Sequence, residues 1–138
     1  MRNQLRFAGV GFGLLLLAAP VLAHHGFYEY DASKRIKMTG VVTKVSWTNP
    51  HMRVYIDVTN KDGNVTTWNM ELTSPTAVQR QGWRKSDLLA GDKVTFEGYV
   101  GKVVANRGLL SSITKVGEDR PLFVLGGPET EKEGPPVQ

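Results

Sequence analysis

The chain of 138 residues has no cysteine, which excludes disulfide scaffolds, thiolate metal sites, iron–sulfur clusters and cysteine nucleophiles. It also carries little net charge. Two of its 17 basic residues lie in an expected leader, and the remaining 15 stand against 13 acidic residues, which leaves a charge of +2. Because this excess is small and scattered along the chain, we expect no nucleic-acid partner.

Long apolar runs are also scarce, and the single one lies at the N-terminus. Two arginines precede the run FAGVGFGLLLLAA, and the residues P-V-L-A follow it. This pattern predicts a signal peptide over residues 1–23. The 17 residues from Phe7 to Ala23 reach only the lower limit of a membrane span, so an uncleaved anchor is the alternative. We expect a periplasmic or secreted protein that begins at His24 and has no stable membrane insertion after cleavage.

Alternating apolar and polar residues predict an all-β domain with one short helix, spanning residues 24–124. Strands are expected at 36–47, 51–59, 65–72, 93–102 and 109–116, and a helix capped by Ser74 is expected at 76–83. This order is typical of a small five-stranded OB-like barrel, with Gly40 as the point where the first strand bends. An open β-sandwich is the alternative. Residues 125–138 are rich in proline, glycine and charge, which predicts a disordered tail.

Several segments of the chain resemble a family of short exported bacterial proteins of unknown function. The resemblance rests on A-H-H-G-F at the cleavage site, T-G-V-V-T-K-V-S-W-T-N-P-H, W-N-M-E-L-T-S-P and G-D-K-V-T-F-E-G-Y. The resemblance covers residues Ala23 to Val116. The chain departs from the family pattern at Met52 and Met70. The resemblance implies an exported, β-barrel-like domain and brings no known activity with it.

Histidine offers the clearest candidate chemistry, because the three histidines fall in two places. His24 and His25 begin the expected mature chain, and His51 begins the second predicted strand. A terminal histidine can bind Cu(II) through its α-amine and its ring, and His51 could supply a third nitrogen. Such a site resembles the histidine brace of exported copper proteins. We therefore predict a copper site at His24 and His51, for metal storage, delivery or sensing.

Alternatives to this copper site remain open. His25 could bind with the terminal amine and the intervening amide, while Met52 and Met70 could be soft ligands for Cu(I). The tryptophans are interpreted as core residues. Glu71 is interpreted as a solvated strand residue, with a rim carboxylate near the site as the alternative. Binding is favoured over copper-dependent redox catalysis, since no further residue indicates a substrate. A metal-free module that binds a small ligand or a periplasmic protein partner is the second functional hypothesis.

Overall fold

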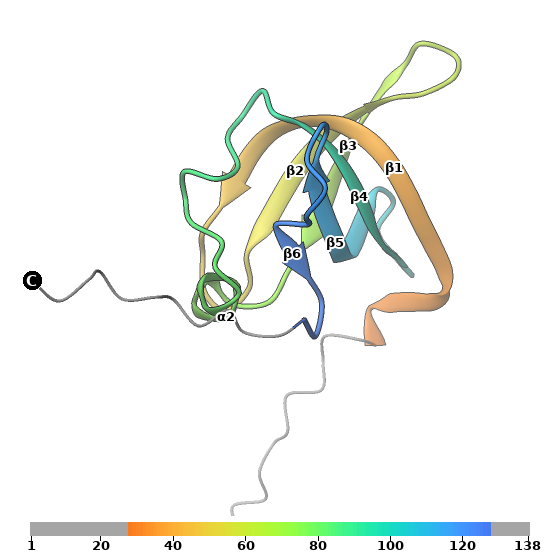
Figure 1. The fold of residues 1–138 in the computed structure, drawn as a ribbon. Coiled ribbons are helices and arrows are strands. Elements are labelled where there is room, and N and C mark those ends of the chain that lie inside the picture. The colour runs from red at the N-terminus through yellow and green to blue at the C-terminus, as the bar shows by residue number, and fades with distance from the viewer. Residues whose placement is uncertain (1–27, 128–138) are drawn as a thin grey trace, which may run out of the picture.

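Residues 28–127 are described here in a computed structural model, in which five strands form a closed ring and a short sixth strand is added at its side (Figure 1). The elements are β1 (Tyr30–Ser46), β2 (Arg53–Thr59), β3 (Val65–Glu71), α2 (Pro75–Arg80), β4 (Lys93–Gly101), β5 (Arg107–Lys115) and β6 (Phe123–Val124). The strand order is β3-β2-β1-β4-β5-β6, and a parallel pairing of β3 with β5 closes the ring. The predicted five-stranded OB-like barrel with one short helix is confirmed.

The long strand β1 belongs to both halves of the barrel. It pairs with β4 from Tyr30 to Val41 and with β2 from Val41 to Ser46. A Cβ atom at Gly40 would lie 2.5 Å from the carbonyl oxygen of Asp57, which is closer than side chains allow. The glycine therefore permits the close approach of β1 and β2, at the position where the sequence predicts a bend.

The observed boundaries differ from the predicted ones most at the starts of the first two strands. β1 begins at Tyr30, earlier than predicted, because its first residues continue the ladder with the end of β4. β2 begins at Arg53, which leaves His51 in the preceding turn. The oxygen of the Ser74 side chain accepts a hydrogen bond from the N–H of Ala77, so the predicted helix cap is confirmed.

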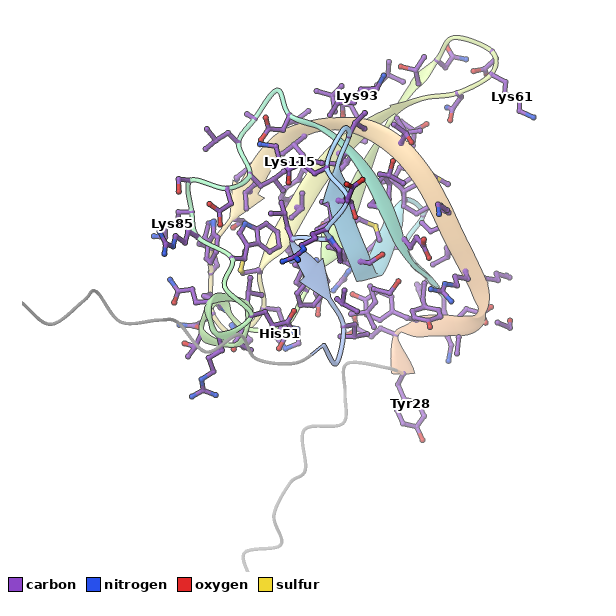
Figure 2. All side chains as sticks on the ribbon, in the orientation of Figure 1. Tyr28, His51, Lys61, Lys85, Lys93 and Lys115 are labelled. Carbon is purple, nitrogen blue, oxygen red and sulfur yellow. The ribbon has the colours of Figure 1, made fainter. Side chains whose placement is uncertain are left out.

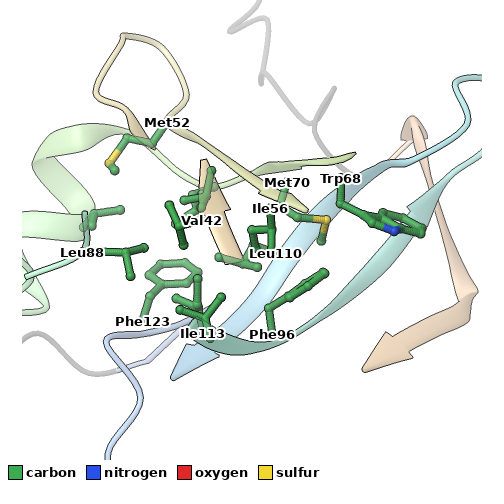
Figure 3. Packing of buried hydrophobic residues seen from close by; sticks show 14 of the residues in the cluster. Val42, Met52, Ile56, Trp68, Met70, Leu88, Phe96, Leu110, Ile113 and Phe123 are labelled. Carbon is green, nitrogen blue, oxygen red and sulfur yellow. The ribbon is translucent and has the colours of Figure 1, made fainter. Parts of the chain in front are cut away.

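Buried apolar side chains fill the ring and the space between it and α2 (Figure 3). This core cluster comprises Val42, Met52, Val54, Ile56, Val58, Trp68, Met70, Leu72, Val78, Trp83, Leu88, Val94, Phe96, Leu110, Ile113 and Phe123. Trp68 and Trp83 are core residues, as predicted, and the ring of Trp47 packs edge-on against that of Trp83. Met52 and Met70 are also fully buried, so their sulfur atoms pack in the core and are not presented as ligands at the surface.

Beyond Val124, the chain continues to contact the barrel as far as it is described. The N–H of Leu125 donates to the carbonyl of Ser111, and the Leu125 side chain packs against the core. No helix within residues 28–127 is long and apolar enough to cross a bilayer. The predicted signal peptide, the terminal histidines His24 and His25, and residues 128–138 of the predicted tail lie outside the described residues.

Candidate functional site

His51 lies in the turn between β1 and β2, with its ring against a buried carboxylate. The ring Nδ1 is 2.5 Å from Oε1 of Glu71, the last residue of β3. The His51 side chain is 41% exposed, whereas that of Glu71 is only 7% exposed. One edge of the imidazole is therefore held inside the barrel, and the ring also reaches solvent.

Three further side chains bind the same carboxylate. The Tyr30 hydroxyl donates to Oε2 of Glu71 at 2.9 Å, and the Nη2 atoms of Arg53 and Arg107 donate to it at 2.6 and 3.0 Å. These donors come from the starts of β1, β2 and β5. We call the five residues, Tyr30, His51, Arg53, Glu71 and Arg107, the Glu71 cluster. It lies where three strands begin and β3 ends.

The strand pairings explain why these residues meet. Arg53 lies opposite Glu71 in the antiparallel β2–β3 ladder, and the parallel β3–β5 pairing places Arg107 opposite Asn69, two residues before Glu71. Cross-strand neighbours on one face lie within reach of long side chains. The ring closure therefore brings two guanidinium groups to one carboxylate.

The cluster keeps Glu71 ionised. Burial would raise the pKa of Glu71, but hydrogen bonds from Arg107, Tyr30 and His51, together with the charge of Arg53, outweigh burial and hold the pKa below its ordinary value. Burial, and then the hydrogen bond to Glu71 and the charge of this carboxylate, raise the pKa of Tyr30 to about 12, so the phenol remains a donor.

This ionisation state fixes the roles of the two ring nitrogens of His51. An ionised carboxylate can only accept hydrogen bonds, so Nδ1 of His51 carries the hydrogen in the bond to Glu71. Nε2 is then the nitrogen left for another partner. Histidines that bind a metal through one ring nitrogen commonly donate the N–H of the other ring nitrogen to a carboxylate, as His51 does to Glu71.

Of the three predicted metal ligands, the structure describes His51 alone. Within residues 28–127, no group of three or more histidine, aspartate or glutamate side chains is placed to hold a metal ion. The copper ligands predicted at His24 and His25 fall before this range and remain predictions. The interpretation of Glu71 as a solvated strand residue is wrong, because the side chain is buried. Its bond to His51 agrees with the alternative, a carboxylate near the candidate site.

A cavity of about 350 Å³ adjoins the cluster. It is formed between residues 28–30, where the described chain begins, and residues 101–104 in the turn between β4 and β5, with Arg107 at its wall. Figure 2 places Tyr28 and His51 at the same end of the barrel, opposite the β2–β3 turn that carries Lys61. The start of the described chain and the candidate ligand thus share one end of the molecule.

Comparison with known families identifies the chain as a member of a family of unknown function (DUF6152), whose model matches residues 13–111. This agrees with the expectation of an uncharacterised family. No curated protein matches the chain.

Among solved structures, the chain is similar to the mitochondrial single-stranded DNA-binding protein Rim1 of S. cerevisiae. One crystal form matches with a TM-score of 0.48 and 10% identity, covering 60% of this chain and 92% of that one. A second form, labelled with selenomethionine, gives a TM-score of 0.43 at 10% identity, with coverages of 60% and 93%.

These neighbours contradict the expectation that nucleic acid is not a partner, and that exclusion is withdrawn. The exclusion of nucleic acid rested on the small net charge of the whole chain. OB barrels bind ligands through one strand face and its loops, and the net charge of the chain does not give the charge of that face. At these TM-scores the likeness carries no argument about what this chain binds.

Proposed function

We propose that this protein is an exported copper-binding barrel, in which His24 at the mature N-terminus and His51 hold one copper ion for storage, delivery or sensing. His24 would supply its α-amine and a ring nitrogen, and His51 would supply Nε2. The α-amine suits this role because its ordinary pKa of about 7.7–8.0 lets a metal displace its proton near neutral pH.

The observation that carries the proposal is the bond between Nδ1 of His51 and the buried Glu71. Metal-binding histidines commonly donate their other ring N–H to a carboxylate, which fixes the tautomer and the ring orientation. Glu71 is itself held by Tyr30 and two arginines, so it forms a rigid support for the imidazole.

The start of the described chain also favours the proposal. Glu29 and Glu71 both bind Nη2 of Arg107, at 3.2 and 3.0 Å, so the chain enters the barrel beside the Glu71 cluster. Three residues lie between His24 and Tyr28. Since extended chain spans about 3.3–3.6 Å per residue, the four steps from Tyr28 to His24 allow His24 to lie up to about 14 Å from the entry point.

The export part of the proposal requires cleavage between Ala23 and His24. Protein recovered from the periplasm or the medium should have the intact mass of residues 24–138. A mature form that retains the leader, or begins at another residue, would contradict both the export proposal and the use of the His24 amine.

The copper proposal is tested by Cu(II) titration of the processed protein against three variants. His51→Ala should weaken binding by about a hundredfold or more, since one nitrogen ligand is lost. One extra residue before His24 should weaken binding further, because the amine leaves the chelating residue. If copper instead binds through His25, the His25→Ala substitution should weaken Cu(II) binding and His51→Ala should leave it unchanged. If the processed wild type binds no better than the extended form, the metal-free interaction module replaces the copper proposal.

A further inference from the structure

Three exposed apolar side chains gather around the cavity beside the Glu71 cluster. Tyr28 is 79% exposed, Val103 is 92% exposed and Val104 is 52% exposed, and all three line this cavity. Exposed apolar side chains that gather at one hollow are typical of a surface that another group covers. Its volume of about 350 Å³ falls in the range that specific ligands or side chains fill.

Arg107, in the wall of the cavity, fixes the point where the described chain begins. Its Nη2 binds Glu29 and Glu71, at 3.2 and 3.0 Å, so the residues just before β1 are held at the edge of the cavity. The group that covers the cavity should bring apolar surface, and the chain that precedes Tyr28 starts at this edge.

We infer that the segment of residues 24–27 docks in this cavity, with the Phe27 ring against Val104. The segment ends at Tyr28, which itself lines the cavity, so docking needs no long connection. The segment also contains one large apolar side chain, that of Phe27, which could cover the exposed valines. The cavity leads to Arg107, which contacts Glu71, which in turn contacts His51.

Docking would give the terminal histidine a fixed position. A segment that occupies its bound conformation before the metal arrives loses less freedom on binding, which raises the apparent affinity. This consequence rests on the proposed copper function, whereas docking itself does not, so the two can fail separately.

The experiment compares Val104→Asp with the matched control Val116→Asp in the processed, metal-free protein. Val116 is 53% exposed but does not line the cavity, so both variants add a charge at an equally exposed valine. NMR should show nuclear Overhauser contacts between the Phe27 ring and the Val104 methyl groups in the wild type. In Val104→Asp, the contacts between the Phe27 ring and the β4–β5 turn should be lost. In Val116→Asp, the contacts between the Phe27 ring and the Val104 methyl groups should be kept. Melting temperatures of both variants should match that of the wild type.

Cu(II) titration of the same three proteins completes the test. Val104→Asp should bind copper about tenfold more weakly than Val116→Asp, because it removes the ordered segment but none of the ligands. Normal copper binding without Phe27 contacts in the wild type would overturn docking and leave the copper proposal standing. Phe27 contacts without copper binding would support docking and contradict the copper proposal. Contacts at Val104 from a second copy or a bound small molecule would overturn docking.

Discussion

The apolar core and the Glu71 cluster are neighbours in the barrel, but different forces hold them together. Met70 and Leu72 flank Glu71 in sequence and pack among apolar side chains, whereas Glu71 meets four hydrogen-bond donors. Replacing buried ion pairs by apolar packing is often neutral or stabilising, so ionic clusters of this kind are not the usual source of stability. The comparison indicates that the core stabilises the barrel and that the cluster positions His51.

Deleting a core side chain should have the largest effect on stability. Phe96 is fully buried on β4, and Phe96→Ala should cost about 3–5 kcal/mol of unfolding free energy through lost burial and the cavity that remains. Denaturant unfolding measures this loss. Leu89→Ala, at an exposed leucine, is the control and should change stability little. Equal losses in the two variants would contradict the observed core.

Removing the carboxylate should have the next largest effect. Glu71→Ala leaves two arginines without their shared partner and should cost roughly 3 kcal/mol of unfolding free energy. It should also weaken Cu(II) binding by about 10- to 100-fold, since His51 loses its orienting acceptor. Glu71→Gln retains an acceptor for Nδ1 and should weaken copper binding less. If both variants bind copper like the wild type, Glu71 has no positioning role.

The acid side of the stability profile should depend on Glu71. Its pKa in the folded protein lies below the ordinary value of 4.5, so the unfolded chain takes up this proton first as the pH falls. The contribution of the Glu71 carboxylate to the unfolding free energy is complete above about pH 4.5, and it is lost as the pH falls through the pKa of Glu71 in the folded protein. Unfolding free energies measured from pH 7 to pH 2 should therefore fall less steeply for Glu71→Gln than for the wild type. Parallel curves would contradict this assignment.

A smaller effect is expected at alkaline pH from Tyr30. The pKa of Tyr30 is about 12 in the folded protein and exceeds its ordinary value of 10.0. The contribution of the Tyr30 phenol to the unfolding free energy is therefore complete below pH 10 and is lost as the pH rises toward 12. Tyr30→Phe should cost about 1 kcal/mol at pH 7 and should lack this alkaline loss. Unfolding free energies at pH 7 and pH 11 test both statements. An alkaline loss that persists in Tyr30→Phe belongs to another group.

The smallest effect is expected at the C-terminus. Removing residues 128–138 should change the unfolding free energy by less than about 0.5 kcal/mol, since their proline, glycine and charged residues predict a disordered tail. A chain that ends at Val124 should be less stable, because it also lacks the packing of Leu125 against the core. Thermal unfolding of the two truncated proteins distinguishes them. A large loss on removing residues 128–138 alone would show that these residues pack.

Local patterns were sufficient to predict the barrel but only part of the candidate site. The hairpin predicted between residues 59 and 65 already places Arg53 opposite Glu71, so this pair could have been found from its register. Arg107 and Tyr30 could not, because they reach Glu71 only through ring closure and through the early start of β1. Burial of Glu71 could not be predicted either, since alternation along β3 predicts which face a residue takes and not what other strands bring to that face.

The most direct test of the account is the imidazole ¹⁵N spectrum of the processed protein, recorded before and after one equivalent of Cu(II). If Glu71 orients His51, the neutral ring of His51 carries its hydrogen on Nδ1 and leaves Nε2 bare. Copper should then broaden the signals of His51 and His24 first. A His51 ring protonated on Nε2 in the metal-free protein, or signals of His51 that copper leaves unchanged, would contradict the account.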